Sequence, residues 1–412
     1  MKLSSFVTAT ATLLSAAWPA CALPAAPESI LSSAPLSKAD EPFSARSRPV
    51  PIVIWHGLGD RFDNDGLQSL KTDLQEREGF EGVFVHIVQL AQDGPGDQRA
   101  TFFGLADDQV ETVCEQLAGL PELTDEDQNP SRQFDAIGFS QGGQFLRAVV
   151  ERCNGARLGG VTMRNLITLG SQHLGISALP PCPPGSSPFS PCRLMHLSLV
   201  REGVYSTWAQ RNIVPAQYFR DPERIDEYFE RNEFLRDINN ERVGDRQPYG
   251  RSPAGESAFS RADGDDEPRN ETYKANLSSL DRFVMFRFSD DMTVIPPHSA
   301  HFTLPLDPTN STCIPPCYST PLPWSSLPLY HQDYVGLRAL DESARVRKEV
   351  CQGQHMQIGD ECWEAVVKHL GSSREGRGAS SSANALEPGV PAGPNLAEVP
   401  SSPPPSFVLQ QG

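Results

Sequence analysis

The sequence predicts an α/β fold in which a mostly parallel central sheet is flanked by helices and carries an inserted helical cap. Short apolar runs alternate along the chain with patterns typical of amphipathic helices. This alternation is typical of a parallel sheet covered on both faces. In addition, roughly 110 residues separate two of the apolar runs, far more than one crossover connection needs.

Five apolar runs predict the buried strands of this sheet. They are residues 51–55, 83–88, 134–137, 165–169 and 283–288. Helices are predicted between them, since apolar residues recur there at the three-and-four spacing of a buried stripe. One stripe comprises Ala106, Val110, Val113 and Leu117, and the next comprises Leu146, Val149, Val150 and Cys153.

The long segment between the fourth and fifth runs predicts a cap over the edge of the sheet, at about residues 175–280. It contains amphipathic stretches with apolar residues at Ile225, Tyr228, Phe229, Phe234, Leu235 and Ile238. A polar, Gly-rich insertion is predicted at 245–268. An ordinary helical layer with no role in binding is the alternative interpretation of this segment.

The two ends of the chain differ in composition from the predicted catalytic domain at 49–370. Lys2 precedes an apolar stretch and then Ala20-Cys21-Ala22, a pattern that predicts a signal peptide at 1–22. Residues 23–48 and the Ser-, Pro- and Gly-rich tail at 371–412 are predicted to be a disordered linker and a disordered tail. No segment is long and apolar enough to predict a transmembrane span.

The cysteines and the glycosylation motifs both fit the secretory route. Of the nine cysteines, Cys21 lies in the predicted signal peptide, and the other eight allow up to four disulfides. Asn-x-Ser/Thr motifs predict glycosylation at Asn270, Asn276 and Asn310. No Cys-x-x-Cys pair or histidine cluster has metal-ligand spacing, so no metal site is expected.

The charge balance bears on possible partners. A formal net charge of −17 gives a long-range field that repels phosphate groups. Nucleic acid and anionic membrane surfaces are therefore not expected as the main partners.

A candidate nucleophile stands where the third run meets the following helix. Residues 134–137 lead directly into Gly138-Phe139-Ser140-Gln141-Gly142, a Gly-x-Ser-x-Gly motif between a strand and a helix. In the α/β-hydrolase fold this context exposes the serine oxygen on a sharp turn. Ser140 is therefore the predicted nucleophile, and the backbone N–H of Gln141 is a predicted oxyanion donor.

A second oxyanion donor is expected from the loop that follows the first strand. His56-Gly57-Leu58-Gly59 occupies that position, and its glycines allow the backbone to approach a ligand closely. The Leu58 N–H is the candidate donor. A plain tight turn is the alternative interpretation.

The acid and the base are expected after the nucleophile, in the chain order Ser, Asp/Glu, His. Asp290 and Asp291 both follow the strand at 283–288, and either can serve as the acid. Among the later histidines, at 298, 301, 331, 355 and 369, His355 is favoured because it lies in a loop before the final helix.

Several segments together resemble the lysosomal palmitoyl-protein thioesterases. They are residues 53–60, 138–149, 237–242, 283–285 and 355–357, and the resemblance covers about 50–370 apart from 245–268 and 305–328. It implies Ser140, Asp291 and His355 as the catalytic residues, and Leu58 and Gln141 as the oxyanion donors. It also implies the bridges Cys114 to Cys153 and Cys182 to Cys192, and a glycan on Asn270.

The chain departs from the family pattern in four respects, one of which is Asp290, which stands where the family has a glycosylated asparagine. An adjacent cysteine pair after the first glycine loop is missing, and Gln354 replaces an aspartate before His355. Cys313, Cys317, Cys351 and Cys362 have no family counterpart. A bridge from Cys351 to Cys362 that tethers the His355 loop is a hypothesis from the sequence.

The resemblance implies a serine hydrolase that cleaves palmitoyl and similar long-chain thioesters from S-acylated proteins through an acyl-serine, without cofactor or metal. A monomer routed to the lysosome, the vacuole or the exterior is expected. An oxygen-ester lipase or carboxylesterase and a catalytically silent lipid-binding relative are the alternatives. Candidates for the acyl groove, or equally for plain core, are Ile176, Leu179, Ile213, Val214, Phe219, Phe229 and Phe234.

Overall fold

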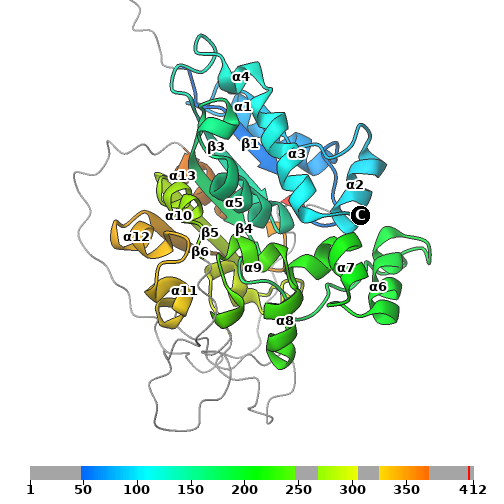
Figure 1. The fold of residues 1–412 in the computed structure, drawn as a ribbon. Helices are drawn as coiled ribbons and strands as arrows, with labels where there is room; N and C mark the ends of the chain where they lie inside the picture. Colours follow the sequence, from blue (N-terminus) through cyan, green and yellow to red (C-terminus); the bar gives the residue numbers. More distant parts are fainter. Residues whose placement is uncertain (1–47, 246–267, 305–323, 371–406, 409–412) are drawn as a thin grey trace, which may run out of the picture. The chain divides into compact units, whose positions relative to one another are not determined.

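Six parallel strands form the central sheet of the computed structural model, which describes residues 48–245, 268–304, 324–370 and 407–408 (Figure 1). The strands are β1 (Ile52–Trp55), β2 (Val85–Ile87), β3 (Gln133–Phe139), β4 (Thr162–Leu169), β5 (Arg282–Phe288) and β6 (Val346–Cys351). Their order is β2-β1-β3-β4-β5-β6, and all neighbours pair in parallel. The first five match the predicted runs, whereas β6 was not predicted.

Both faces of the sheet are covered by helices, which confirms the predicted fold class. Successive strand residues point to opposite faces, so Ile52 and Ile54 pack in one core and Val53 and Trp55 in the other. The first core contains residues of α1 (Asp65–Glu76) and α13 (Asp360–Leu370), and the second contains residues of α3 (Ala106–Ala118), α5 (Gln141–Cys153) and α10 (Glu271–Ser278). This two-sided burial explains the high share of apolar residues in strands such as β1 and β5.

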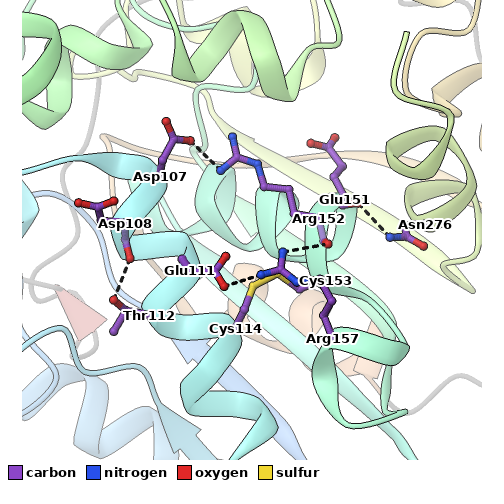
Figure 2. Close-up of a disulfide and its surroundings, with 10 residues drawn as sticks. All are labelled: Asp107, Asp108, Glu111, Thr112, Cys114, Glu151, Arg152, Cys153, Arg157 and Asn276. Carbon is purple, nitrogen blue, oxygen red and sulfur yellow. Dashed lines mark hydrogen bonds and ion pairs between the residues drawn. A yellow bond between two sulfur atoms is a disulfide. The ribbon is translucent and has the colours of Figure 1, made fainter. Parts of the chain in front are cut away.

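Helices α3 and α5 are joined by a disulfide, shown in Figure 2. Cys114 and Cys153 form the bridge, with their Cα atoms 6.1 Å apart. Beside it, the Arg152 guanidinium lies 2.7 Å from Asp107. Both apolar stripes predicted for these helices are buried in the core that they share with the sheet.

The segment between β4 and β5 contains a group of short helices, green in Figure 1. They are α6 (Pro191–Glu202), α7 (Thr207–Asn212), α8 (Ile225–Arg231) and α9 (Phe234–Ile238), with 3-10 turns at Val214–Tyr218 and Pro222–Arg224. A disulfide between Cys182 and Cys192 closes the loop that leads into α6. Helix α10 packs on α5 and so belongs to the layer that covers the sheet.

The side chains proposed for an acyl groove pack instead as core. Six of them are buried in one continuous cluster, and Leu179 packs against it: the six are Ile176, Ile213, Val214, Phe219, Phe229 and Phe234. The structure therefore favours the plain-core interpretation for these residues.

The remaining elements are short. They are α2 (Gly94–Phe102), α4 (Pro121–Thr124), α11 (Pro328–His331), α12 (Leu337–Glu342), 3-10 turns at Ala156–Leu158, Pro297–His301 and Trp324–Ser326, and the antiparallel pair β7 (Gln357–Ile358) and β8 (Phe407–Val408). Within the described ranges, no helix has the length and apolar character needed to cross a bilayer.

Several predictions concern residues that lie outside the described part of the chain. These are the signal peptide at 1–22, the linker up to residue 47, the insertion from 246 to 267, Asn310, Cys313, Cys317, and the tail apart from Phe407–Val408.

The strand order determines where a site can form. The chain runs from β1 outward to β2 and then returns past β1 to β3, so the connections leave the neighbouring strands β1 and β3 in opposite directions. In open parallel sheets, ligands bind at the carboxyl ends of the strands at such a switch point. The loop beginning at His56 follows β1 here, and Ser140 follows β3.

Candidate active site

Ser140 occupies a sharp turn between β3 and α5. Its backbone has φ 50° and ψ −119°, a conformation that non-glycine residues rarely adopt. A side chain at Gly138 would collide with the backbone of Gly143, and one at Gly142 would collide with the carbonyl oxygens of Trp55 and His56. The glycines of the motif thus allow the close packing of strand, turn and helix that exposes the serine hydroxyl.

Three side chains from three loops meet at this turn. His355 Nε2 lies 3.0 Å from Ser140 Oγ, and His355 Nδ1 lies 2.7 Å from Asp291 Oδ2. The other oxygen of Asp291 accepts the backbone N–H groups of Thr293 and Val294, both at 2.9 Å. The side chains of His355 and Asp291 are 4% and 1% exposed, so the pair is largely shielded from water.

The geometry distinguishes between the two adjacent aspartates. Asp290 is exposed, and its carboxylate accepts a hydrogen bond from the Ser289 hydroxyl at 3.1 Å. Asp291 is buried behind the His355 ring. Of the two carboxylates that the residue order left open, Asp291 is the one that contacts the imidazole.

The competing histidine His301 ends the 3-10 turn Pro297–His301, and its ring contacts the backbone of β5 and β6. His301 Nε2 lies 3.0 Å from the carbonyl oxygen of Met285 and 3.1 Å from that of Glu349. Burial, and then the nearby Lys348 and Arg287, lower the pKa of His301 to about 3. It is therefore a neutral structural residue at physiological pH.

The loop that carries His355 is fixed at both ends. Cys351, the last residue of β6, forms a disulfide with Cys362 of α13, as hypothesised from the sequence. The Gly353 N–H donates to the Ser289 hydroxyl at 2.9 Å. At Gly170, where φ is +58°, a Cβ would lie only 2.9 Å from the His355 ring, so a larger residue would displace the imidazole.

Both predicted oxyanion donors adjoin Ser140. A Cβ added to Gly57 would lie 3.1 Å from the Ser140 Cβ, which places the loop containing Leu58 directly against the nucleophile. Gln141 begins α5, where backbone N–H groups have no acceptor within the helix. The Gln141 side chain accepts a hydrogen bond from the Tyr218 hydroxyl at 2.9 Å, which links this helix end to the cap.

The polar residues that support this site were not predicted from the sequence. Tyr218 was not singled out, and neither were Asp97 and Thr101 of α2, which contact the loop after β1. Asp97 and Thr101 are separated by one helical turn, so they lie on one face of α2. That spacing is a weak signal, because nothing in the sequence shows which loop the face meets.

Two other polar groupings do not belong to this site. Cys182, Cys192 and His196 lie close together, but both sulfur atoms form the disulfide and no thiolate is left to bind a metal. A cavity of about 330 Å³ in the cap is lined by residues of α7 and α8 and their flanks, without a member of the Ser140 cluster.

Comparison with known proteins identifies the family. The family model described as palmitoyl protein thioesterase matches residues 51–355. Palmitoyl-protein thioesterase 1 of Caenorhabditis elegans is 32% identical over 77% of this chain and 89% of its own length. The chain belongs to the palmitoyl-protein thioesterase family. It is accordingly a thioester hydrolase, and the resemblance seen in the sequence is confirmed.

A second relative matches a smaller part of this chain, and a solved structure matches it at lower sequence identity. A palmitoyl-protein thioesterase-dolichyl pyrophosphate phosphatase fusion of Schizosaccharomyces pombe is 32% identical over 62% of this chain. The matched segment covers 35% of the length of the fusion. The RedJ thioesterase from the prodiginine pathway of Streptomyces coelicolor is 18% identical over 82% of this chain and 90% of that chain, with a TM-score of 0.33. A TM-score this low adds nothing to the family assignment.

Proposed function

We propose that this thioesterase is a serine hydrolase that removes palmitoyl and similar long-chain acyl groups from cysteines of S-acylated proteins. The observation that carries the proposal is the continuous chain of contacts from Ser140 Oγ through the His355 ring to Asp291. Relatives named for this activity support the choice of substrate. No metal or organic cofactor has a part in the mechanism.

In the proposed reaction, Ser140 Oγ attacks the thioester carbonyl carbon while His355 Nε2 accepts its proton. Asp291 stabilises the imidazolium, and the N–H groups of Leu58 and Gln141 stabilise the oxyanion. The C–S bond then breaks. A cysteine thiol has a pKa of about 8.5, so the thiolate leaves with little acid assistance. The thiolate takes up the proton held by His355 Nε2, which restores the neutral imidazole. His355 then accepts a proton from water as the water oxygen attacks the acyl carbon, and it passes this proton to Ser140 Oγ as the acyl-serine bond breaks and the fatty acid leaves.

The acyl chain supplies most of the binding energy in this proposal. Each buried CH₂ group contributes about 0.8 kcal/mol. We expect kcat/KM to rise with chain length until further carbons no longer contact the protein, and a series of acyl thioesters from hexanoyl to palmitoyl measures that limit.

We also propose the secretory route and a monomeric state. Three disulfides in the described residues suit an oxidising compartment, such as the route to the lysosome, the vacuole or the exterior. Sedimentation of the purified protein tests the monomer.

The deciding experiment compares a palmitoyl-thioester probe with the matching oxygen ester, using purified protein and the Ser140→Ala variant. Preferential thioester turnover that Ser140→Ala abolishes supports the proposal. Faster oxyester turnover indicates a carboxylesterase. Failure of a fluorophosphonate probe to label Ser140 indicates a catalytically silent relative.

A further inference from the structure

Helix α2 contacts the loop after β1 at several points. The loop runs from His56 to Phe62 and contains Leu58. Thr101 Oγ1 accepts the Gly59 N–H at 2.8 Å, and the Gln98 side-chain amide donates to the Gly59 carbonyl oxygen at 2.7 Å. Both polar groups of the Gly59 backbone are therefore held by this one helix.

Asp97 makes the central contact between α2 and the loop. Its Oδ2 accepts the Phe62 N–H at 2.8 Å, and its Oδ1 accepts the Leu90 N–H at 2.7 Å. Oδ2 also lies 2.8 Å from His56 Nε2, an ion-pair contact in which the N–H is not well aligned with the oxygen. Asp97 thus fixes the loop at both ends.

The His56–Asp97 pair is fully enclosed. Both side chains are 0% exposed. Burial disfavours the charged form of His56, yet the carboxylates of Asp97 and Asp60 outweigh it and raise the pKa of His56. A buried ion pair of this kind contributes little net stability unless its geometry is well satisfied, and removal of one partner is costly. His56 adjoins Gly57 in the sequence, and a Cβ added at Gly57 would lie 3.1 Å from the Ser140 Cβ, so the pair is placed to act on the site.

We propose that α2 is the platform that holds the Leu58 N–H in place beside Ser140, with Asp97 and His56 as its main positioning residues. This inference rests on the proposed function, because it concerns the oxyanion of that reaction. Preorganised donors stabilise the transition state more than the bound substrate. In this proposal, Asp97 and His56 therefore affect kcat and leave the affinity for the bound substrate unchanged.

The test compares Asp97→Asn with Asp93→Asn. Asp93 lies at the same end of α2, but its carboxylate accepts the Gly96 N–H of the helix and is not among the contacts with the loop. Three measurements are made: steady-state kinetics (kcat and KM) with a palmitoyl thioester, the affinity for a palmitoyl trifluoromethyl ketone, and the affinity for a hexadecyl thioether peptide. The ketone forms an oxyanion on the serine. The thioether has no carbonyl group to attack.

We expect Asp97→Asn to lower kcat and the ketone affinity by a common factor of about 10-fold to 100-fold, with the thioether affinity within about twofold. Asp93→Asn should change none of the three. An equal loss of ketone and thioether affinity would indicate general damage to the site and overturn the proposal, as would an unchanged kcat. Thr101→Val, which removes the Gly59 contact and a hydrogen bond to the Gln98 carbonyl oxygen within α2 but leaves Asp97 in place, should show a smaller loss of the same kind and serves if Asp97→Asn does not fold.

Hydrogen exchange of residues 57–62 tests the platform independently of turnover. Asp97→Asn should speed exchange in this loop, whereas Asp93→Asn should not. Unchanged exchange would refute the platform even in an inactive enzyme. Lack of thioesterase activity in the unsubstituted protein would refute only the proposed function.

Discussion

Two neighbouring carboxylates after β5 have different surroundings. Asp291 is buried, accepts two backbone N–H groups and contacts His355, whereas Asp290 faces solvent. A carboxylate in the position of Asp291 holds the imidazole in the tautomer that accepts the serine proton and stabilises the imidazolium. The two residues therefore provide a matched pair for mutation.

We expect Asp291→Asn to lower kcat about 10²-fold to 10⁴-fold, because the ring is no longer held in that tautomer. Asp290→Asn should change kcat less than about twofold, since an exposed carboxylate adds little to the site. Steady-state kinetics on a palmitoyl thioester compares the two variants. Equal losses in both would argue against Asp291 as the acid.

The glycosylation motifs at Asn270 and Asn276 have different surroundings. Asn270 is exposed before α10, where its Oδ1 accepts the Thr272 N–H at 3.0 Å. Asn276 is half-buried, and its Nδ2 donates to the backbone oxygen of Glu151 at 2.9 Å (Figure 2). A glycan on Asn276 would have to grow from the nitrogen that faces α5.

We therefore expect a glycan on Asn270 and none on Asn276 in folded protein expressed through a secretory pathway. Asn270→Gln should increase gel mobility by one glycan, and Asn276→Gln should leave it unchanged. The mobility of both variants before and after glycosidase treatment is the measurement. A glycan found on a peptide containing Asn276 would show that the contact with Glu151 does not form.

At the scale of elements, the sequence predicted five strands, including β2 at one edge of the sheet, but not β6 at the other edge. Residues 134–137 and 283–288 are apolar except for Asp135 and Arg287, because helices cover both faces of the sheet there. In β6, Arg347, Lys348 and Glu349 stand between Val346 and Val350, because most side chains of this strand are exposed or half-buried. Such an interrupted pattern is also typical of a loop.

The loop that follows β6 depends on the Cys351–Cys362 bridge. This bridge and Cys182–Cys192 enclose chain segments of similar length, with separations of 11 and 10 residues. The entropy model predicts similar losses of stability on removal, of about 2–4 kcal/mol. Only the first bridge lies beside His355.

Replacing both cysteines of the first bridge by serine should therefore lower kcat about tenfold or more, because a misplaced base is costly to the reaction. The same change at Cys182 and Cys192 should lower the melting temperature similarly and leave kcat nearly unchanged. Melting curves and kinetics of the two double variants give the comparison. Similar kcat values in both would show that the first bridge does not position His355.

At the scale of the whole molecule, the candidate site combines one feature formed by residues adjacent in the sequence with several contacts between residues far apart in the sequence. Ser140 was predictable because strand, turn and helix are adjacent in the sequence. The contact of Asp97 with His56 was not, because it depends on α2 returning over the end of β1. His355 could be favoured but not selected by position alone, since other histidines also follow the acid and only the fold shows which ring reaches Ser140.

The buried pair Glu151 and Arg147 makes the stability of the folded protein depend on pH. Glu151 of α5 is fully buried, with its carboxylate 3.8 Å from Arg147. Burial raises the pKa of Glu151 from 4.5 to about 8, against the opposing effect of Arg147. The folded state therefore binds this proton more tightly than the unfolded state. The stability that Glu151 contributes is fully present below about pH 4.5 and is lost as the pH rises towards 8.

Buried histidines have the opposite effect, because a low pKa such as that of His301 makes the fold less stable in acid. The contribution of Glu151 must therefore be measured as a difference. Between pH 5 and 8, the melting temperature of Glu151→Gln should rise by several degrees relative to the unsubstituted protein, because glutamine binds no proton. Glu111→Gln, at an exposed ion pair on α3, should show a constant difference. A constant difference for Glu151→Gln as well would mean that Glu151 is already ionised in the folded protein at pH 5, and that Arg147 outweighs the effect of burial.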